Sequence, residues 1–82
     1  MKIPRDISGE QLAKLLEKVG YRLTRQTGGH MRLTAAVSGE HHLTIPKHKP
    51  LKVGTLSGIL RDVAQYLKIS RDELIRRLLQ GD

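Results

Sequence analysis

The sequence contains no cysteine, no tryptophan and no phenylalanine, and only two tyrosines. The absence of cysteine excludes disulfides, thiolate zinc sites and cysteine nucleophiles, and it fits a reducing compartment. With so few aromatic residues, the core must consist mainly of Leu, Ile and Val, and little aromatic surface remains for stacking on bases. Any contact with nucleic acid would therefore depend on charge and shape.

Long apolar runs are also absent. No uncharged stretch approaches the roughly 20 residues that cross a bilayer, and the first residues lack the apolar segment of a signal peptide. We therefore expect a cytoplasmic protein without a membrane anchor. A chain of 82 residues has room for one modest core, which predicts a single domain over residues 1–82.

Positive charge is abundant: 15 Lys and Arg face 8 Asp and Glu, giving a formal net charge of +7. The excess is concentrated between residues 22 and 52, where six basic residues face one acid, and all four histidines lie in the same segment. A basic composition by itself can serve solubility alone. Because this charge is clustered, it favours a polyanionic partner, and nucleic acid above all.

Apolar spacing predicts the first helix and the first strand. Ser8 precedes Gln11 by three residues, as in a capping box, and an apolar stripe at helical spacing follows. A helix is expected over residues 9–19, ending at Gly20. From residue 21 the period becomes two, which predicts a strand buried on one side. Its core-facing residues would be Tyr21 and Leu23, and its outward residues Arg22, Thr24 and Gln26.

The remainder of the chain predicts two further strands and two helices. Residues 30–37 and 41–45 alternate, with turns at Gly28-Gly29 and at residues 38–40, so the three strands form an antiparallel meander. A helix is expected from about residue 54 to 67, and a short one capped by Ser70 and Glu73 continues to residue 79. The fold class is α+β, in the order α-β-β-β-α plus a C-terminal helix, with the helices covering one sheet face. The other, wet face would carry Arg22, His30, Arg32, Thr34, His42 and Thr44.

Cations gather before the predicted second long helix. Lys47, Lys49 and Lys52 precede a helix start, where free N–H groups favour a phosphate, and Thr55 could add a hydroxyl. A solvated lysine loop is the alternative interpretation. The candidate RNA-binding residues are Arg22, Arg32, Lys47, His48, Lys49, Lys52 and Thr55.

His30 is the candidate catalytic residue. It begins a strand directly after two glycines, where small residues allow close approach. RNA carries its own nucleophile, the 2′-hydroxyl, so cleavage needs only proton transfer by a group such as imidazole and cations that offset the phosphorane charge. A lone strand histidine is also typical of a structural role. His41 and His42 point to opposite faces and cannot both bind one metal. A zinc site built from His30, His48 and one of that pair is an alternative that no spacing supports, so no metal or other cofactor is expected.

Several motifs together resemble the HicA (YcfA-like) toxin family of bacterial and archaeal toxin–antitoxin pairs. They are Gly28-Gly29-His30, Thr44-Ile45-Pro46, and Leu51-Lys52-Val53-Gly54-Thr55-Leu56 followed by Ile59-Leu60. The resemblance covers about residues 8–79. It implies a fold like the double-stranded-RNA-binding domain and metal-independent cleavage of mRNA, with His30 as the catalytic histidine. It also implies a HicB-type antitoxin that masks this histidine. Gly29 occupies a position where the family often has Ser.

Three other interpretations remain open. The chain could be an RNA-binding module without cleavage, since double-stranded-RNA domains contact phosphates and 2′-hydroxyls largely without reading sequence. It could read DNA through a helix-turn-helix over residues 55–79, although the acids Asp72 and Glu73 at the start of the recognition helix are unfavourable. It could also be a purely structural protein that binds an acidic partner.

Overall fold

The computed structural model describes residue 3 and residues 6–80. The single domain predicted over residues 1–82 therefore includes residues 1–2, 4–5 and 81–82, which lie outside the described part. Along the chain the elements are α1 (Gly9–Leu16), a 3₁₀ turn η1 (Glu17–Val19), β1 (Tyr21–Thr27), β2 (His30–Ala35), β3 (His41–Pro46), α2 (Val53–Leu67) and α3 (Arg71–Leu79). This order confirms the predicted α+β fold. Among the described residues, no helix is both long and apolar enough to cross a bilayer.

The first helix begins and ends as its sequence dictates. The Ser8 hydroxyl accepts from the Gln11 backbone N–H at 3.1 Å, and the Gln11 side-chain oxygen accepts from the Ser8 N–H at 2.8 Å, which completes the capping box. The last turn tightens into η1, and Gly20 follows with a φ of 102°. Because this left-handed conformation strains any residue with a Cβ, glycine redirects the chain here into β1.

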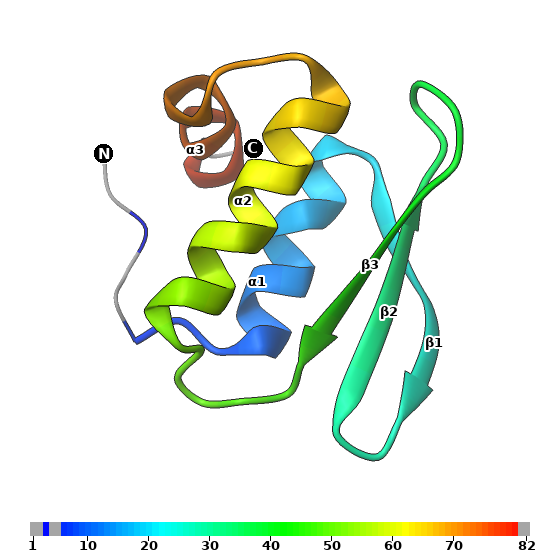
Figure 1. Cartoon of the computed structure of the whole chain (residues 1–82), viewed down its shortest axis with the longest axis vertical. Coiled ribbons are helices and arrows are strands. Elements are labelled where there is room, and N and C mark those ends of the chain that lie inside the picture. The colour runs from blue at the N-terminus through cyan, green and yellow to red at the C-terminus, as the bar shows by residue number, and fades with distance from the viewer. Residues whose placement is uncertain (1–2, 4–5, 81–82) are drawn as a thin grey trace.

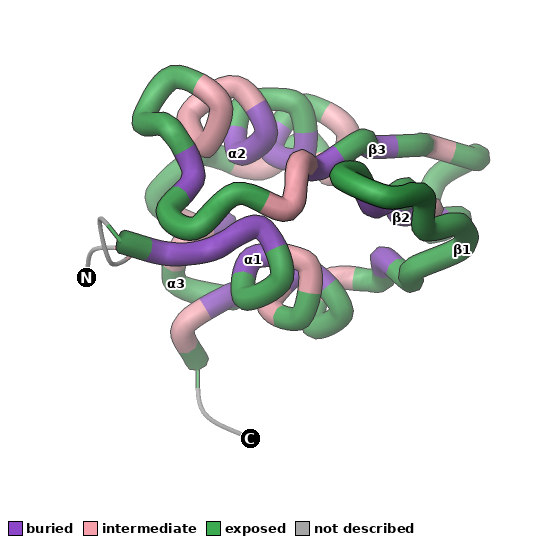
Figure 2. The backbone as a smooth tube through the Cα atoms, turned by 90° about the horizontal axis from the view of Figure 1, so that it is seen from below, coloured by how far each residue is buried: buried purple, intermediate pink, exposed green. Residues whose placement is uncertain are grey.

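The three strands form one antiparallel sheet in the order β1-β2-β3. Met31, Leu33 and Ala35 of β2 and Leu43 and Ile45 of β3 are buried, while the residues between them are exposed or half-buried. This alternation gives the sheet one apolar face, which packs on the helices, and one outer face in water (Figure 2). Its predicted wet-face residues are all exposed or half-buried, as expected.

The alternation predicted for β1 is only partly correct. A β-bulge lies between Leu23 and Arg25, which pair with Leu33 and Arg32 respectively. Beyond the bulge the faces exchange, because the extra residue shifts the pairing by one. Gln26 therefore pairs with the buried Met31 rather than lying on the outer face, and Arg25 lies on the outer face beside Arg32. Leu23 is 48% exposed, so it contributes less to the core than expected.

The helices cover one side of the sheet, and both α1 and α2 pack against it (Figure 1). α2 turns Ile59, Leu60, Val63 and Ala64 inward, where they join the buried strand residues in one hydrophobic cluster. α3 packs against α1, η1 and α2 and buries Leu74 and Leu78. Each such aliphatic side chain contributes about 1.5–3 kcal/mol on burial, so a core without Phe or Trp is sufficient to hold the helices on the sheet.

Two helix starts differ slightly from expectation. α2 begins at Val53, earlier than predicted, with Lys52 as its N-cap. At α3 the Ser70 hydroxyl accepts from the Glu73 N–H at 3.0 Å. The reciprocal half of the predicted capping box is not made, because the Glu73 carboxylate instead accepts from Arg76 and Arg77.

Candidate active site

His30 lies exposed at the first position of β2. It pairs with Thr27 of β1 and with Pro46 of β3, so it occupies the central strand at one end of the sheet. Its neighbours Met31 and Leu33 face the core, and the His30 side chain therefore projects from the outer face. Within the part of the chain that the structure describes, the His30 ring makes no hydrogen bond, so both nitrogens are open to a ligand.

Main-chain hydrogen bonds hold the lysine-bearing loop beside this histidine. The Lys47 N–H donates to the carbonyl of Gly29 at 2.9 Å, which places the start of the loop next to the residue that precedes His30. The Gly9 N–H donates to the His48 carbonyl at 2.9 Å, and the Leu51 N–H donates to the Ile7 carbonyl at 2.9 Å. The loop is thus tied to the sheet at its start and to the beginning of α1 farther along.

The predicted cations of this loop diverge in direction. Lys47 is half-buried and directly follows Pro46, the cross-strand partner of His30. His48 and Lys49 are exposed, but Lys49 lines a cavity with Lys14 of α1 and Asp6, away from the α2 start. Of the three predicted lysines, Lys47 thus has the closest backbone link to His30.

The start of α2 is open to solvent and to anions. Lys52 is its N-cap and is exposed, its side chain makes no capping hydrogen bond, and the first turn contains no acid. Thr55, in that turn, is half-buried. A helix N-terminus with free N–H groups and no carboxylate nearby favours a phosphate.

The outer sheet face adds arginines to the region of His30. Arg32 follows His30 by two residues on the same face of β2, and Arg22 pairs with Thr34 farther along the sheet; both are exposed. Sequence reasoning missed Arg25, which the β-bulge brings opposite Arg32. The structure thus adds one cation to the predicted set on this face.

His41 and His42 lie on opposite faces of β3, as predicted, and each makes a side-chain hydrogen bond. His41 is half-buried, and its Nδ1 lies 2.7 Å from the Tyr21 hydroxyl, while its ring stacks on Tyr66 at 4.6 Å. Exposed His42 contacts Thr34 through Nδ1 at 2.8 Å. Among residues 3 and 6–80, no three His, Asp or Glu side chains are grouped in a way that would hold a metal ion.

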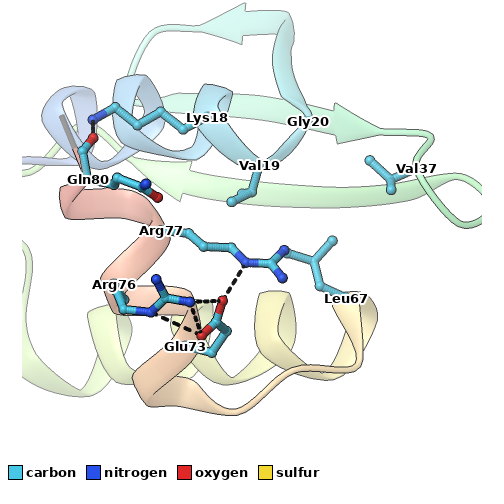
Figure 3. A pocket seen from close by; sticks show the side chains of 9 residues that line it. All are labelled: Lys18, Val19, Gly20, Val37, Leu67, Glu73, Arg76, Arg77 and Gln80. Atoms are coloured by element: carbon cyan, nitrogen blue, oxygen red, sulfur yellow. Dashed lines mark hydrogen bonds and ion pairs between the residues drawn. The ribbon is translucent and has the colours of Figure 1, made fainter. Parts of the chain in front are cut away.

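A cavity of about 660 Å³ lies at the opposite end of the sheet from His30, lined by Gly20, Val37 and residues of the helices (Figure 3). Its charges are already engaged. Glu73 accepts from Arg76 and Arg77, which hold the pKa of its carboxyl below the usual range, and Lys18 donates to the carbonyls of Leu78 and Gln80. The Lys18 bonds thus attach the end of α3 to η1, whereas the Glu73 ion pairs lie within α3.

One comparison with known proteins found a match. The family model described as the HicA toxin of bacterial toxin–antitoxin systems matches residues 9–64. The chain belongs to the HicA toxin family. The matched segment runs from the first residue of α1 to Ala64 in α2, and it includes His30 and the lysine loop. No curated protein and no solved structure matched the chain. HicA membership makes the chain a toxin-family protein and implies an antitoxin as its partner.

Proposed function

We propose that this chain is a metal-independent endoribonuclease that cleaves mRNA in the cytoplasm and is neutralised by a HicB-type antitoxin. The observation that carries the proposal is the exposed His30 ring on the outer sheet face, beside a loop that begins at Lys47. An imidazole in water next to fixed cations has the chemistry that RNA cleavage requires.

The proposed reaction uses the 2′-hydroxyl of the RNA as nucleophile. His30 accepts the proton of this hydroxyl, the 2′-oxygen attacks the adjacent phosphorus, and the bond from phosphorus to the 5′-oxygen of the next nucleotide breaks. That oxygen leaves with a proton from solvent, and the products are a 2′,3′-cyclic phosphate and a 5′-hydroxyl end. Lys47, the N–H groups at the start of α2 and Arg32 offset the extra negative charge of the phosphorane.

Open space around the two glycines supports close approach of the substrate backbone. A Cβ built at Gly28 or Gly29 would meet no atom within 4 Å. The turn before His30 therefore leaves the ring accessible from solvent. The remaining predicted contacts, Arg22, His48, Lys49, Lys52 and Thr55, would hold flanking parts of the RNA.

The test compares purified wild-type protein with His30→Ala on a defined RNA and on the same RNA with a single 2′-deoxy nucleotide at the cleaved position. Loss of a general base lowers the rate by roughly 10²–10⁴-fold, so His30→Ala should abolish measurable cleavage. The 2′-deoxy substrate should resist the wild type, and EDTA should have no effect.

His48→Ala is the matched loss of an imidazole, since His48 is also exposed. As a predicted RNA contact it should weaken RNA binding, but at saturating RNA its cleavage rate should stay within a few-fold of the wild type. Equal cleavage by wild type and His30→Ala would refute the mechanism. Retained RNA binding without cleavage by any variant, the wild type included, would instead support a non-catalytic RNA-binding module.

A further inference from the structure

The outer face of the sheet carries a second cluster of cations beyond the His30 end. A cleft of about 460 Å³ is lined there by Arg22, Arg25 and Arg32, together with two threonines, Glu40 and His42. We refer to the three arginines and this hollow as the arginine cleft. Its residues belong to the outer face of the sheet. α1 and α2 cover the other side of the three strands (Figure 1).

Arg25 and Arg32 are an unfavourable pair unless an anion lies between them. They are direct cross-strand partners on the same face, where Cβ atoms stand about 4.5–5.5 Å apart and like charges repel. In the described residues, neither guanidinium forms an ion pair that would offset this repulsion. Such a pair next to a hollow fits a bound phosphate, because guanidinium binds phosphate in a bidentate manner.

Glu40, the acidic residue of the cleft, already contacts a neighbouring side chain. The Glu40 carboxylate lies 3.1 Å from His42 Nε2, and His42 Nδ1 lies 2.8 Å from the Thr34 hydroxyl. Thr34 in turn lies 2.9 Å from the Thr24 hydroxyl. These hydrogen bonds order the side chains of the cleft and hold the Glu40 carboxylate on His42. Because Glu40 does not pair with an arginine, the three guanidinium groups remain available to bind an anion.

The position of the cleft indicates a polynucleotide as its occupant. Arg32 and His30 are two residues apart on one strand and one face, about 6.5 Å along β2. An RNA strand repeats its phosphate at every nucleotide, so a strand held at His30 continues over Arg32 and Arg25. No Phe, Tyr or Trp lies among the cleft residues, and the His42 ring is held by Glu40 and Thr34. The contact would therefore be with the backbone rather than with the bases.

We propose that the arginine cleft clamps the phosphates of the RNA strand that flank the scissile bond at His30, with Arg25 as the residue that completes it. This inference rests on the proposed RNA substrate and adds the path that the strand takes across the sheet. It predicts a backbone contact independent of base sequence.

The experiment measures binding of a fluorescently labelled 20-nucleotide single-stranded RNA as a function of salt, in His30→Ala protein so that the probe stays intact. Arg25→Gln should weaken binding roughly fivefold near 0.1 M salt and reduce the salt slope by about 0.7, the value for one lost phosphate contact on a single strand. Arg61→Gln removes the same charge from the exposed surface of α2 and should change the affinity less than twofold.

A double variant that moves the arginine by one position tests whether its location, and not only its charge, matters for RNA binding. Arg25→Gln combined with Gln26→Arg preserves composition and net charge but moves the guanidinium to the position paired with Met31. Affinity should stay as low as in the single variant, with thermal melting confirming that each variant is folded. The inference is overturned if Arg25→Gln binds like its parent or if the relocated arginine restores affinity. If the cleft variants show no effect on binding but the wild type cleaves RNA, only the cleft inference fails and the proposed function stands. If the cleft binds RNA as expected but the wild type never cleaves it, only the proposed nuclease activity is refuted.

Discussion

Replacing Gly9 by alanine should destabilise the protein, although alanine is the better helix former. Gly9 begins α1 against the end of β3, and a Cβ there would overlap the Pro46 carbonyl oxygen and lie 3.3 Å from Ile45 Cγ2. The backbone cannot simply turn aside, because the Gly9 N–H donates to the His48 carbonyl at 2.9 Å. Alanine must therefore push α1 and the lysine loop apart.

The change in the free energy of unfolding is the sum of two destabilising contributions and one stabilising contribution. Overpacking costs about 1–3 kcal/mol, and losing the bond to His48 costs about 1 kcal/mol. Alanine in place of glycine returns about 0.5–1 kcal/mol of helix propensity. The net loss is about 1–3 kcal/mol, which lowers the melting temperature of a domain this small by roughly 5–20 °C.

Thermal unfolding followed by circular dichroism measures this loss, and Gly58→Ala provides the control. Gly58 lies inside α2, where an added Cβ meets no atom within 4 Å, so the same substitution should raise the melting temperature. The two variants should therefore shift in opposite directions. A Gly9→Ala protein that melts at or above the wild-type temperature would refute the packing argument.

Three further outcomes are expected. Gly29→Ser should leave the melting temperature unchanged, because the added Cβ enters open space. It should raise the rate of RNA cleavage by supplying the hydroxyl that the family often has at this position, and a lower rate would contradict this expectation. Ser70→Ala should cost about 1 kcal/mol in urea unfolding through loss of the α3 cap. Burial, reinforced by the charges of Tyr66 and Asp62, raises the pKa of Tyr21 well above its usual range. The unfolded chain therefore loses the Tyr21 proton at a lower pH than the folded chain, and the free energy of unfolding should fall as pH rises above about 10. In Tyr21→Phe that alkaline decline should be shallower than in the wild type when both are unfolded in urea across this range.

The periodicity of the sequence was sufficient to predict the element order and most of the core. The helix limits were within a residue or two, because the capping residues Ser8, Gly20 and Ser70 act locally. The exception is the end of α1 at Leu16, because the three residues before Gly20 form the 3₁₀ turn η1 instead. β2 was predicted too long at its end: Val37 is 63% exposed and lies beyond Ala35, where the strand stops. A single apolar residue in a connection carries no periodicity that would reveal this.

Strict alternation of buried and exposed residues did not predict the β-bulge, although the sequence contains a signal for it. A two-residue turn at Gly28-Gly29 pairs Thr27 with His30 and hence Arg25 with Arg32. Tyr21, at the other end of β1, must face the core opposite Ala35. The two requirements differ by one residue, so β1 needs an extra residue between them. Counting from both ends of the hairpin would have found the bulge and placed Arg25 correctly.

The directions of the loop lysines were beyond sequence reasoning. Their spacing placed Lys49 near the α2 start, whereas the bond between Gly9 and His48 turns this part of the loop towards α1. Such a contact joins residues far apart in the chain, and no local pattern encodes it. The exposure of His30, in contrast, followed directly from its place in the alternation of β2.

Among residues 3 and 6–80, the exposed His30 ring makes no hydrogen bond to another side chain, and main-chain hydrogen bonds hold the loop beside it. Under the proposed mechanism, inactivation therefore needs no loss of fold. A single base change at codon 30 would remove the proposed catalytic group and leave the surface that an antitoxin binds. Such inactive copies should persist in a genome and compete for the antitoxin, which lowers the amount that remains for active relatives.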